Sequence, residues 1–299
     1  MSAKIRRLKI VVALTIAISL VIVLLTPSPV VPATICKADS DSVPLYIQDF
    51  SVVPQPIVDD ASGAAAELFG NNQQKCRDFT GQLLATYLEA KDKDIVVIFN
   101  AGGWGWDSID DSPGWKSIID GIKAELSDLG YTYLILEHKR TAHTLNGCLS
   151  EFMFTAYLYP MKAEDLAARV EFLTRHIPDI RIILTGESNG TSICSSTLHI
   201  LQENTKVYSI LTGPPFWNNN IASDRSLILR GNGATPDTFS SGDIITIIRS
   251  NLEAMFGISQ QYPGNILFYI GAPGHDYNWE YEEVHSRITN FLNNNFSPE

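Results

Sequence analysis

The chain has 299 residues, a hydrophobic content of 45% and a formal net charge of −11. Its length and composition are sufficient for a buried core in one large domain or two small ones. The negative charge argues against a nucleic-acid partner and against anionic membrane surfaces for the folded part, because both require clustered lysine and arginine side chains.

The N-terminal segment is basic and then apolar. Four basic residues lie within the first nine, and an apolar run covers residues 10–25 before Pro27. Basic residues before the run and acidic residues after it orient the N-terminus inside. The run is long for a signal-peptide core and short for a spanning helix. We therefore expect residues 1–33 to be an uncleaved membrane anchor, with a signal cleaved near Val31-Pro32-Ala33 as the alternative. Both interpretations export the body.

Four cysteines accompany this expected export. An oxidising compartment permits disulfides, and Cys36 with Cys76 is one possible pair among three connectivities. Cys194 falls on an apolar helical segment, where a free buried thiol is an equally good interpretation. The spacing contains no CxxC pair, so a structural zinc site is not predicted.

Apolar runs alternate with helical periodicity along the body. Residues 43–53 predict an edge strand, cut short by following prolines, and residues 78–90 predict a helix. Buried strands are then predicted at 94–103, 131–137, 180–186, 207–213, 226–231 and 265–271. Helices are predicted at 115–129, 166–177, 190–203, 244–255 and 284–292. This alternation predicts an α/β fold with a mostly parallel central sheet and helices on both faces, in one domain over residues 34–299.

The stretch "LTGESNGTS" at 184–192 places Ser188 between two glycines where a predicted strand ends. A GxSxG turn between a strand and a helix forces its serine into a strained conformation, and the flanking glycines remove Cβ atoms that would clash. The helix that follows directs its amide groups and the positive end of its dipole at the same place. In this context we interpret Ser188 as a nucleophile rather than as part of an ordinary glycine turn.

A serine needs a base to accept its proton. Three of the six histidines fall in predicted helices, and His138 and His143 follow an earlier strand and could line the site. His275 lies just past the last predicted strand, on a short turn from which a base could reach Ser188. We therefore expect His275 to be the base.

The order of strands and helices, the GESNG turn and the late Gly-His resemble the α/β-hydrolase superfamily over about residues 94–292. The "NAGGW" run after the strand at 94–103 looks like that family's oxyanion loop. The resemblance implies a catalytic triad in the order Ser, acid, His. It also implies an oxyanion hole made by the backbone N–H of Asn189 and one from Gly102, Gly103 or Trp104.

The acid that the resemblance implies should follow the strand at 226–231 and precede His275. The sequence departs from the common pattern, because Ala234 occupies the approximate place of the usual aspartate. Asp237 implies a longer turn, whereas Asp243 begins a predicted helix, where an acidic residue is normal. We expect Asp237 to be the acid, with Asp243 as the alternative.

The resemblance implies hydrolysis of a small-molecule acyl substrate, an ester in the plainest case, through an acyl-enzyme and without a metal or cofactor. Trp104, Trp106, Phe216 and Trp217 are expected beside the pocket mouth, and residues 141–161 could form a cap. Thioesterase, peptidase and acyltransferase activities remain open, as does the oligomeric state. A catalytically silent protein that binds a partner at the cell surface is the rival interpretation.

Overall fold

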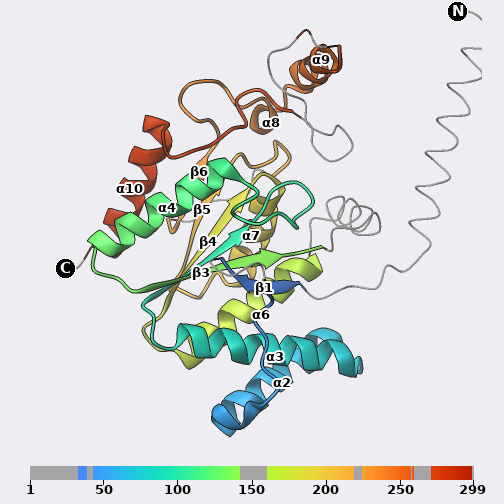
Figure 1. Cartoon of the computed structure of the whole chain (residues 1–299), viewed down its shortest axis with the longest axis vertical. Coiled ribbons are helices and arrows are strands. Elements are labelled where there is room, and N and C mark those ends of the chain that lie inside the picture. The colour runs from blue at the N-terminus through green and yellow to red at the C-terminus, as the bar shows by residue number, and fades with distance from the viewer. Residues whose placement is uncertain are drawn as a thin grey trace, which may run out of the picture.

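The apolar runs form one six-stranded sheet in the computed structural model, which describes residues 33–38, 43–141, 160–218, 224–256, 258 and 271–297 (Figure 1). The neighbouring strands β3, β2, β4, β5 and β6 pair in parallel, and β1 pairs antiparallel with β3. In sheet order the strands are β1 (Thr34–Lys37), β3 (Tyr133–Lys139), β2 (Ile95–Asn100), β4 (Arg181–Glu187), β5 (Val207–Thr212) and β6 (Ser226–Leu229).

Side chains of the buried strands alternate between two cores, as the period of a strand requires. Val97 and Phe99 of β2 pack into the core under α4 (Pro113–Asp128) and α10 (Glu282–Phe296). Val96 and Ile98 face the other core, under α6 (Pro160–His176) and α7 (Asn189–Ile200). The predicted α/β fold, with a mostly parallel sheet and helices on both faces, is confirmed.

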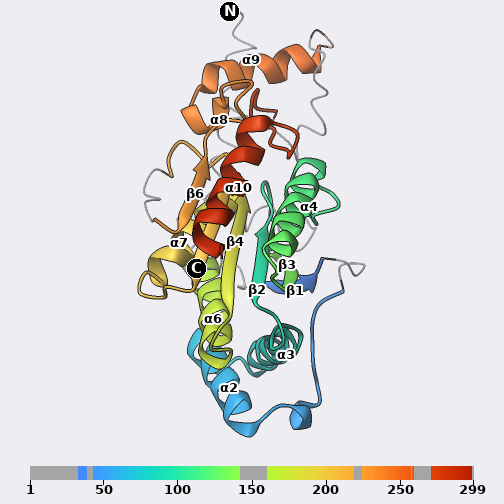
Figure 2. The same cartoon turned by 90° about the vertical axis from the view of Figure 1, so that its left-hand side faces the viewer.

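The remaining helices lie at the two ends of the molecule. Figure 2 shows α2 (Gln55–Phe69) and α3 (Gln73–Ala90) at one end, and α8 (Thr238–Ser241) and α9 (Ile244–Met255) at the other. The first pair builds a small core of its own with Phe172 of α6.

The edge strand predicted at 43–53 is wrong. Pro44 makes a single bridge to Cys36, and a short 3₁₀ helix, η1 (Phe50–Val52), follows. Pro54 and Pro56 then start α2, a position that suits proline because the first helical N–H groups have no partner in the helix. The true edge strand is β1. The predicted strand at 265–271 lies outside the described residues except for Gly271, and the expected cap falls largely on the undescribed residues 142–159.

Cys36, Cys76 and Cys194 are free thiols, so Cys36–Cys76, one of the pairings that the sequence left open, is not formed. Cys36 is buried in β1, whereas the Cys76 sulfur contacts the carbonyl oxygens of Ala65 and Gly70 at 3.5 and 3.4 Å. Cys148 lies outside the described residues.

None of the helices within the described ranges is long and apolar enough to cross a membrane. The apolar run at 10–25, which carries the prediction of an anchor, lies outside those ranges.

A buried polar network ties β1 to the sheet and occupies His138, one of the histidines considered for the site. His138 Nδ1 lies 2.7 Å from Asn100 Oδ1, and its Nε2 lies 3.7 Å from Asp165 Oδ1. Arg169 donates to Asp165 over 2.6 Å and to the carbonyl of Ala33 over 2.8 Å. Burial lowers the pKa of His138, so its ring is neutral here and serves structure.

The network predicts a large stability effect at Asp165. Asp165→Asn leaves the Arg169 guanidinium buried without its counter-charge, and we expect the free energy of unfolding to fall by about 3–5 kcal/mol in urea titrations. Asp110→Asn, which breaks an exposed ion pair with Lys116, is the matched control and should change it little. Equal losses in the two variants would contradict a special role for the buried network.

Candidate active site

The turn after β4 holds Ser188 in a conformation that side chains rarely adopt. Ser188 has φ 49° and ψ −120°, and it is the only residue other than glycine with a positive φ among the described residues. Such a conformation costs on the order of 1–3 kcal/mol and persists only where the surroundings fix it. Here Ser188 N–H donates to the carbonyl of Thr212 over 3.0 Å, and its carbonyl accepts the N–H of Thr191 over 3.0 Å.

Gly190 explains the second glycine of the turn. A Cβ at this position would lie 2.2 Å from the carbonyl oxygen of Asn100, at the end of β2. The start of α7 can therefore approach β2 only with glycine here. This close approach brings Ser188 beside Gly102, where a Cβ on the glycine would lie 3.2 Å from the Ser188 Cβ.

Ser188 lies at the point where the connections of the sheet change direction. β2 leads through α4 to β3 on one side, whereas β4 leads through α7 to β5 on the other. In open α/β sheets the crevice between two such strands, at their carboxyl ends, is where ligands bind. The loop after β2 and the turn after β4 meet at this crevice.

The expected oxyanion donors surround Ser188 but are not equivalent. The N–H of Asn189 is the first of α7 and has no carbonyl partner within its helix. The N–H of Gly102, in contrast, points at the Glu187 carboxylate, with 3.4 Å between N and Oε2. Gly103 and Trp104 follow in the same loop, and the Asn189 side chain donates to the carbonyl of Gly103 over 3.3 Å.

The buried residue Arg140 stabilises this loop. Arg140 Nη1 donates to the carbonyl of Ala101 over 2.7 Å, and the Arg140 N–H donates to the carbonyl of Gly105 over 2.8 Å. The loop backbone is therefore held from two sides, by Arg140 and by α7.

His275 and Asp237 come together although 38 residues separate them. His275 Nδ1 lies 2.9 Å from Asp237 Oδ2. The two loops are joined by Thr238, whose N–H and hydroxyl both donate to the carbonyl of Pro273, over 3.0 and 2.9 Å. The long turn expected after β6 is thereby present, and it delivers Asp237 to the histidine.

Asp237 is 2% exposed and accepts several other hydrogen bonds. Its Oδ1 accepts the N–H groups of Phe239 and Ser240, so it caps α8, and its Oδ2 accepts the hydroxyl of Tyr277 over 2.7 Å. Burial alone would raise the pKa of Asp237, but the hydrogen bonds and charge of His275 outweigh it and hold the pKa below its usual value. Asp237 is therefore a carboxylate at neutral pH.

The second nitrogen of His275 is left without a partner. His275 Nε2 is buried and makes no hydrogen bond within the described residues, to Ser188 or to any other. A Cβ on Gly213 would lie 2.4 Å from His275 Cε1, so the ring rests on the residue after Thr212. Thr212 is also the residue that accepts the Ser188 N–H. The end of β5 therefore contacts both residues.

The alternative acid Asp243, and Asp276 beside His275, are both engaged elsewhere. Asp243 is exposed at the start of α9, where it accepts the N–H and hydroxyl of Thr246 over 3.1 and 2.6 Å. Asp276 accepts the side chain of Asn232 and the hydroxyl of Tyr281. His143 lies outside the described residues.

The expected aromatic wall divides into two groups. Trp104 and Trp106 stack with their ring centroids 6.2 Å apart on the loop after β2. The second group is a continuous series of ring contacts with centroid distances of 4.8, 5.5 and 4.9 Å, in the order Phe216, Trp217, Phe239 and His275.

Three residues of the site were not predicted from the sequence. Phe239 and Tyr277 each come two residues after a predicted site residue, and Glu187 comes directly before Ser188. Their proximity in the chain was the available signal, but only the folded turns bring them to Asp237, His275 and Gly102. Within the described residues no group of His, Cys, Asp and Glu side chains could hold a metal ion.

No family model and no curated protein match the chain. Among solved structures it is similar to a Trichoderma reesei cutinase in complex with a phosphonate inhibitor, with 14% identity over 64% of this chain and 82% of the cutinase chain and a TM-score of 0.35. It is also similar to a protein of unknown function from Agrobacterium tumefaciens, described as a candidate α/β hydrolase, with 14% identity, coverage of 70% and 91%, and a TM-score of 0.36. The strand order and the Ser188 turn of this chain, rather than these scores, make the fold α/β-hydrolase-like.

The Glu187 carboxyl predicts an unusual dependence of stability on pH. Burial raises its pKa above the ordinary value, against the lowering effects of His275 and the Gly102 N–H. As the pH rises, the Glu187 carboxyl therefore loses its proton in the unfolded chain before it does so in the folded chain. The free energy of unfolding of the wild type falls between the ordinary pKa of about 4.3 and the folded-state pKa. Glu187→Gln cannot ionise. Its stability relative to wild type should increase with pH across this window in urea titrations.

The control for this measurement is Asp237→Asn, whose stability relative to wild type should decrease as the pH rises. The lowered pKa of Asp237 contributes stability above its ordinary pKa of about 3.9, and that contribution is lost as the pH falls. A flat pH profile for the stability difference between Glu187→Gln and wild type would contradict the raised pKa.

Proposed function

We propose that the protein is an exported serine hydrolase that cleaves a carboxylic ester through an acyl-enzyme. The observations that carry the proposal are the contact between Asp237 and His275, whose second nitrogen is buried without a hydrogen-bond partner among the described residues, and the strained turn at Ser188. This pattern of nucleophile, base and orienting carboxylate is the recurring geometry of serine hydrolysis.

Each member of the triad has a defined task in this mechanism. Ser188 Oγ attacks the acyl carbonyl while His275 Nε2 takes its proton. Asp237 accepts a hydrogen bond from the Nδ1–H of His275 and remains ionised, which fixes the ring tautomer and stabilises the imidazolium that forms. Protonated His275 then donates to the leaving oxygen, and water attacks the acyl-enzyme with His275 again acting as base. Tyr277 and Ser240 hold the Asp237 carboxylate in position.

The tetrahedral oxyanion would be held by the N–H of Asn189 and an N–H from the loop after β2. Gly103 and Trp104 are the better sources in that loop, since the Gly102 N–H points at the Glu187 carboxylate. Loss of a single oxyanion donor typically costs about a hundredfold or more in rate.

The wall of the site supports an apolar acyl or aromatic ester as substrate. Trp217 and Phe239 bring two apolar aromatic rings into contact with the ring of His275. The two stacked tryptophans of the loop after β2 lie beside the expected oxyanion donors. An ester is the simplest acyl group that this arrangement accommodates, and thioester and amide cleavage use the same groups.

A catalytically silent binding protein is the second candidate, and one observation favours it. The Glu187 carboxylate lies against Gly102, Ser188 and the charge of His275, where negative charge would oppose a forming oxyanion. The raised pKa of Glu187 reduces this opposition, because it extends the pH range over which the carboxyl is protonated and uncharged.

Labelling with a membrane-impermeant fluorophosphonate tests both activity and export. We expect the probe to label intact cells at one serine, and Ser188→Ala to abolish labelling and ester hydrolysis while preserving the fold, because alanine keeps the Cβ of serine. Ser195→Ala, further along α7, is the matched control and should label normally. Labelling only after lysis would contradict export, and labelling that persists in Ser188→Ala would contradict the nucleophile.

The acid is tested by paired substitutions. Asp237→Asn replaces an acceptor of three hydrogen bonds at Oδ2 with a group that can donate, and we expect turnover to fall by roughly four orders of magnitude. Asp243→Asn should retain turnover. Both should lower the melting temperature, because each carboxylate caps a helix, so turnover is measured well below melting. Loss of turnover in folded Asp243→Asn alone would contradict the assignment.

A further inference from the structure

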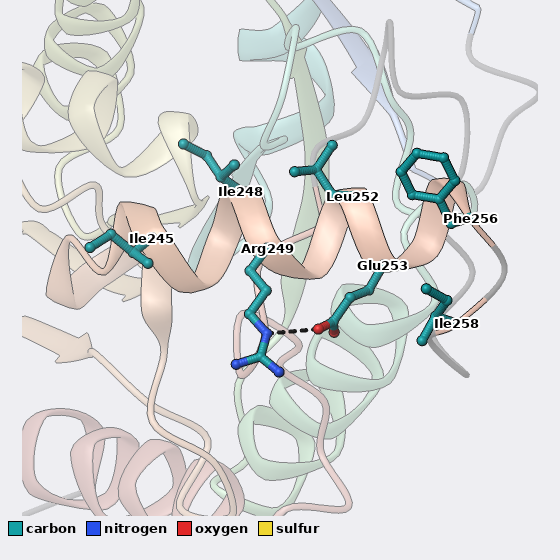
Figure 3. Close-up of a pocket in the computed structure, with 7 residues that line it drawn as sticks. All are labelled: Ile245, Ile248, Arg249, Leu252, Glu253, Phe256 and Ile258. Carbon is teal, nitrogen blue, oxygen red and sulfur yellow. Dashed lines mark hydrogen bonds and ion pairs between the residues drawn. The ribbon is translucent and has the colours of Figure 1, made fainter.

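Helix α9 exposes large apolar side chains to solvent. Ile245 is 81% exposed, and Phe256 and Ile258, just after the helix, are 74% and 73% exposed. These side chains line a shallow groove of about 460 Å³ together with Ile248, Leu252, Arg249 and Glu253 (Figure 3). Single exposed apolar residues are common on proteins, but a contiguous apolar patch marks an interaction site. We refer to Ile245, Ile248, Leu252, Phe256 and Ile258 as the α9 patch.

The α9 patch carries almost no charge. Ile248, Leu252 and Phe256 are spaced four apart and form one row, which Figure 3 shows along one side of the helix. The two charged residues beside the row, Arg249 and Glu253, form an ion pair of 2.7 Å with each other. The patch therefore offers apolar area without a net charge.

The fold fixes the direction in which the α9 patch faces. The buried side chain of Asn251 donates to the carbonyl of Gly271 over 2.7 Å and accepts its N–H over 3.0 Å. This paired contact attaches α9 to the segment that leads to His275, four residues later. The apolar row consequently faces outward while α9 is held in place.

The α9 patch lies at the same end of the molecule as the candidate active site. Helix α8, which Asp237 caps, connects to α9 through Gly242, and Figures 1 and 2 both place the two helices together at the end away from α2. Trp217 is 43% exposed and contacts Phe239, which contacts the ring of His275. Ring contacts thus lead from an exposed tryptophan to His275, the proposed base.

Charge discriminates between the possible occupants of the patch. A second copy would bring two bodies of like charge together, since the chain carries −11, and the patch has no charged group to offset that repulsion. An anionic surface meets the same objection. A neutral lipid surface needs no charge on the protein, and helices with an apolar face settle about 5–10 Å into such an interface.

We propose that the α9 patch docks onto a bilayer of zwitterionic phospholipid, with Phe256 and the row of Ile248 and Leu252 buried below the headgroups. Docking goes beyond the proposed hydrolysis and does not depend on it. If the hydrolysis also holds, the bilayer would deliver lipid-dissolved esters to the mouth beside Trp217.

The test measures how deeply the α9 patch itself lies in the bilayer, because the predicted N-terminal anchor alone would hold the full chain on vesicles. Full-length Phe256→Trp is reconstituted in phosphatidylcholine vesicles with or without bromine on the acyl chains, and the fluorescence of the parent chain is subtracted. We expect brominated lipid to lower the emission of the new tryptophan about twofold, because its ring lies within the acyl boundary. Val52→Trp, in η1 before α2, is the matched exposed control and should not be quenched.

Three outcomes would overturn the proposal. The first is equal emission of Phe256→Trp in the two kinds of vesicle, or equal quenching of Val52→Trp. The second is quenching that appears only when anionic lipid is added, because the patch has no basic cluster for it. The third is a blue shift of Phe256→Trp that depends on protein concentration without vesicles, which would indicate a second copy.

A double substitution separates docking from catalysis. Ile248→Gln with Leu252→Gln keeps good helix formers and removes apolar area, so it should abolish the quenching of Phe256→Trp. It should leave hydrolysis of a water-soluble short-chain ester unchanged and lower hydrolysis of a vesicle-embedded ester. Val52→Gln with Ile200→Gln, at similarly exposed apolar positions, should change neither. Quenching that survives the α9 double substitution would contradict docking, whereas absent ester hydrolysis in the parent chain would contradict only the proposed function.

Discussion

The approach of Gly190 to the end of β2 is the contact on which the candidate site depends. It lets α7 start directly against the Asn100 carbonyl, and this forces the backbone of Ser188 into its positive φ. The strain is held by two backbone hydrogen bonds, one to Thr212 and one from Thr191. Any side chain at residue 190 would push the helix away from β2. It would thereby separate Ser188 from the loop that carries Gly102. The absence of a Cβ at residue 190 therefore keeps the two parts of the candidate site together.

Asp237 combines a structural role with the one proposed for it in catalysis. One oxygen caps α8 and the other receives Tyr277, Ser240 and His275. A buried carboxylate with this many donors is held as an anion with little freedom to reorient, and such preorganisation gives it influence on the imidazole. Glu187 is the counterpart. Among the described residues its carboxyl receives one long backbone contact, from Gly102, so burial dominates and its pKa rises.

The sequence was sufficient for the parts of the molecule that local patterns encode. Continuous apolar runs marked β2 to β6, and the glycines around Ser188 marked the turn, because sheet burial and backbone clashes act over a few residues. The edge strand β1 and helix α2 were missed, since a four-residue strand has almost no periodicity and prolines at 54 and 56 suited a helix start as well as a strand end. Tyr277 and Phe239 could not be assigned, because their roles come from two loops meeting through Thr238 and Pro273.

Helix α9 shows that apolar periodicity can predict a helix without predicting whether its apolar face is buried. Its apolar spacing predicts a helix correctly, and the same spacing would suit a helix packed on the sheet. In the folded chain Asn251 faces inward and satisfies the backbone of Gly271, while Ile245, Ile248 and Leu252 remain in solvent. The apolar arc is thus wider than the face that the fold covers. Hydrophobic area that a protein does not bury in itself is available for an external surface, and here it lies at the same end of the molecule as helix α8 and the loop of Asp237. The same end of the molecule therefore carries the candidate nucleophile Ser188 and an exposed apolar helix, which is the arrangement that the proposed lipid-dissolved substrate would require.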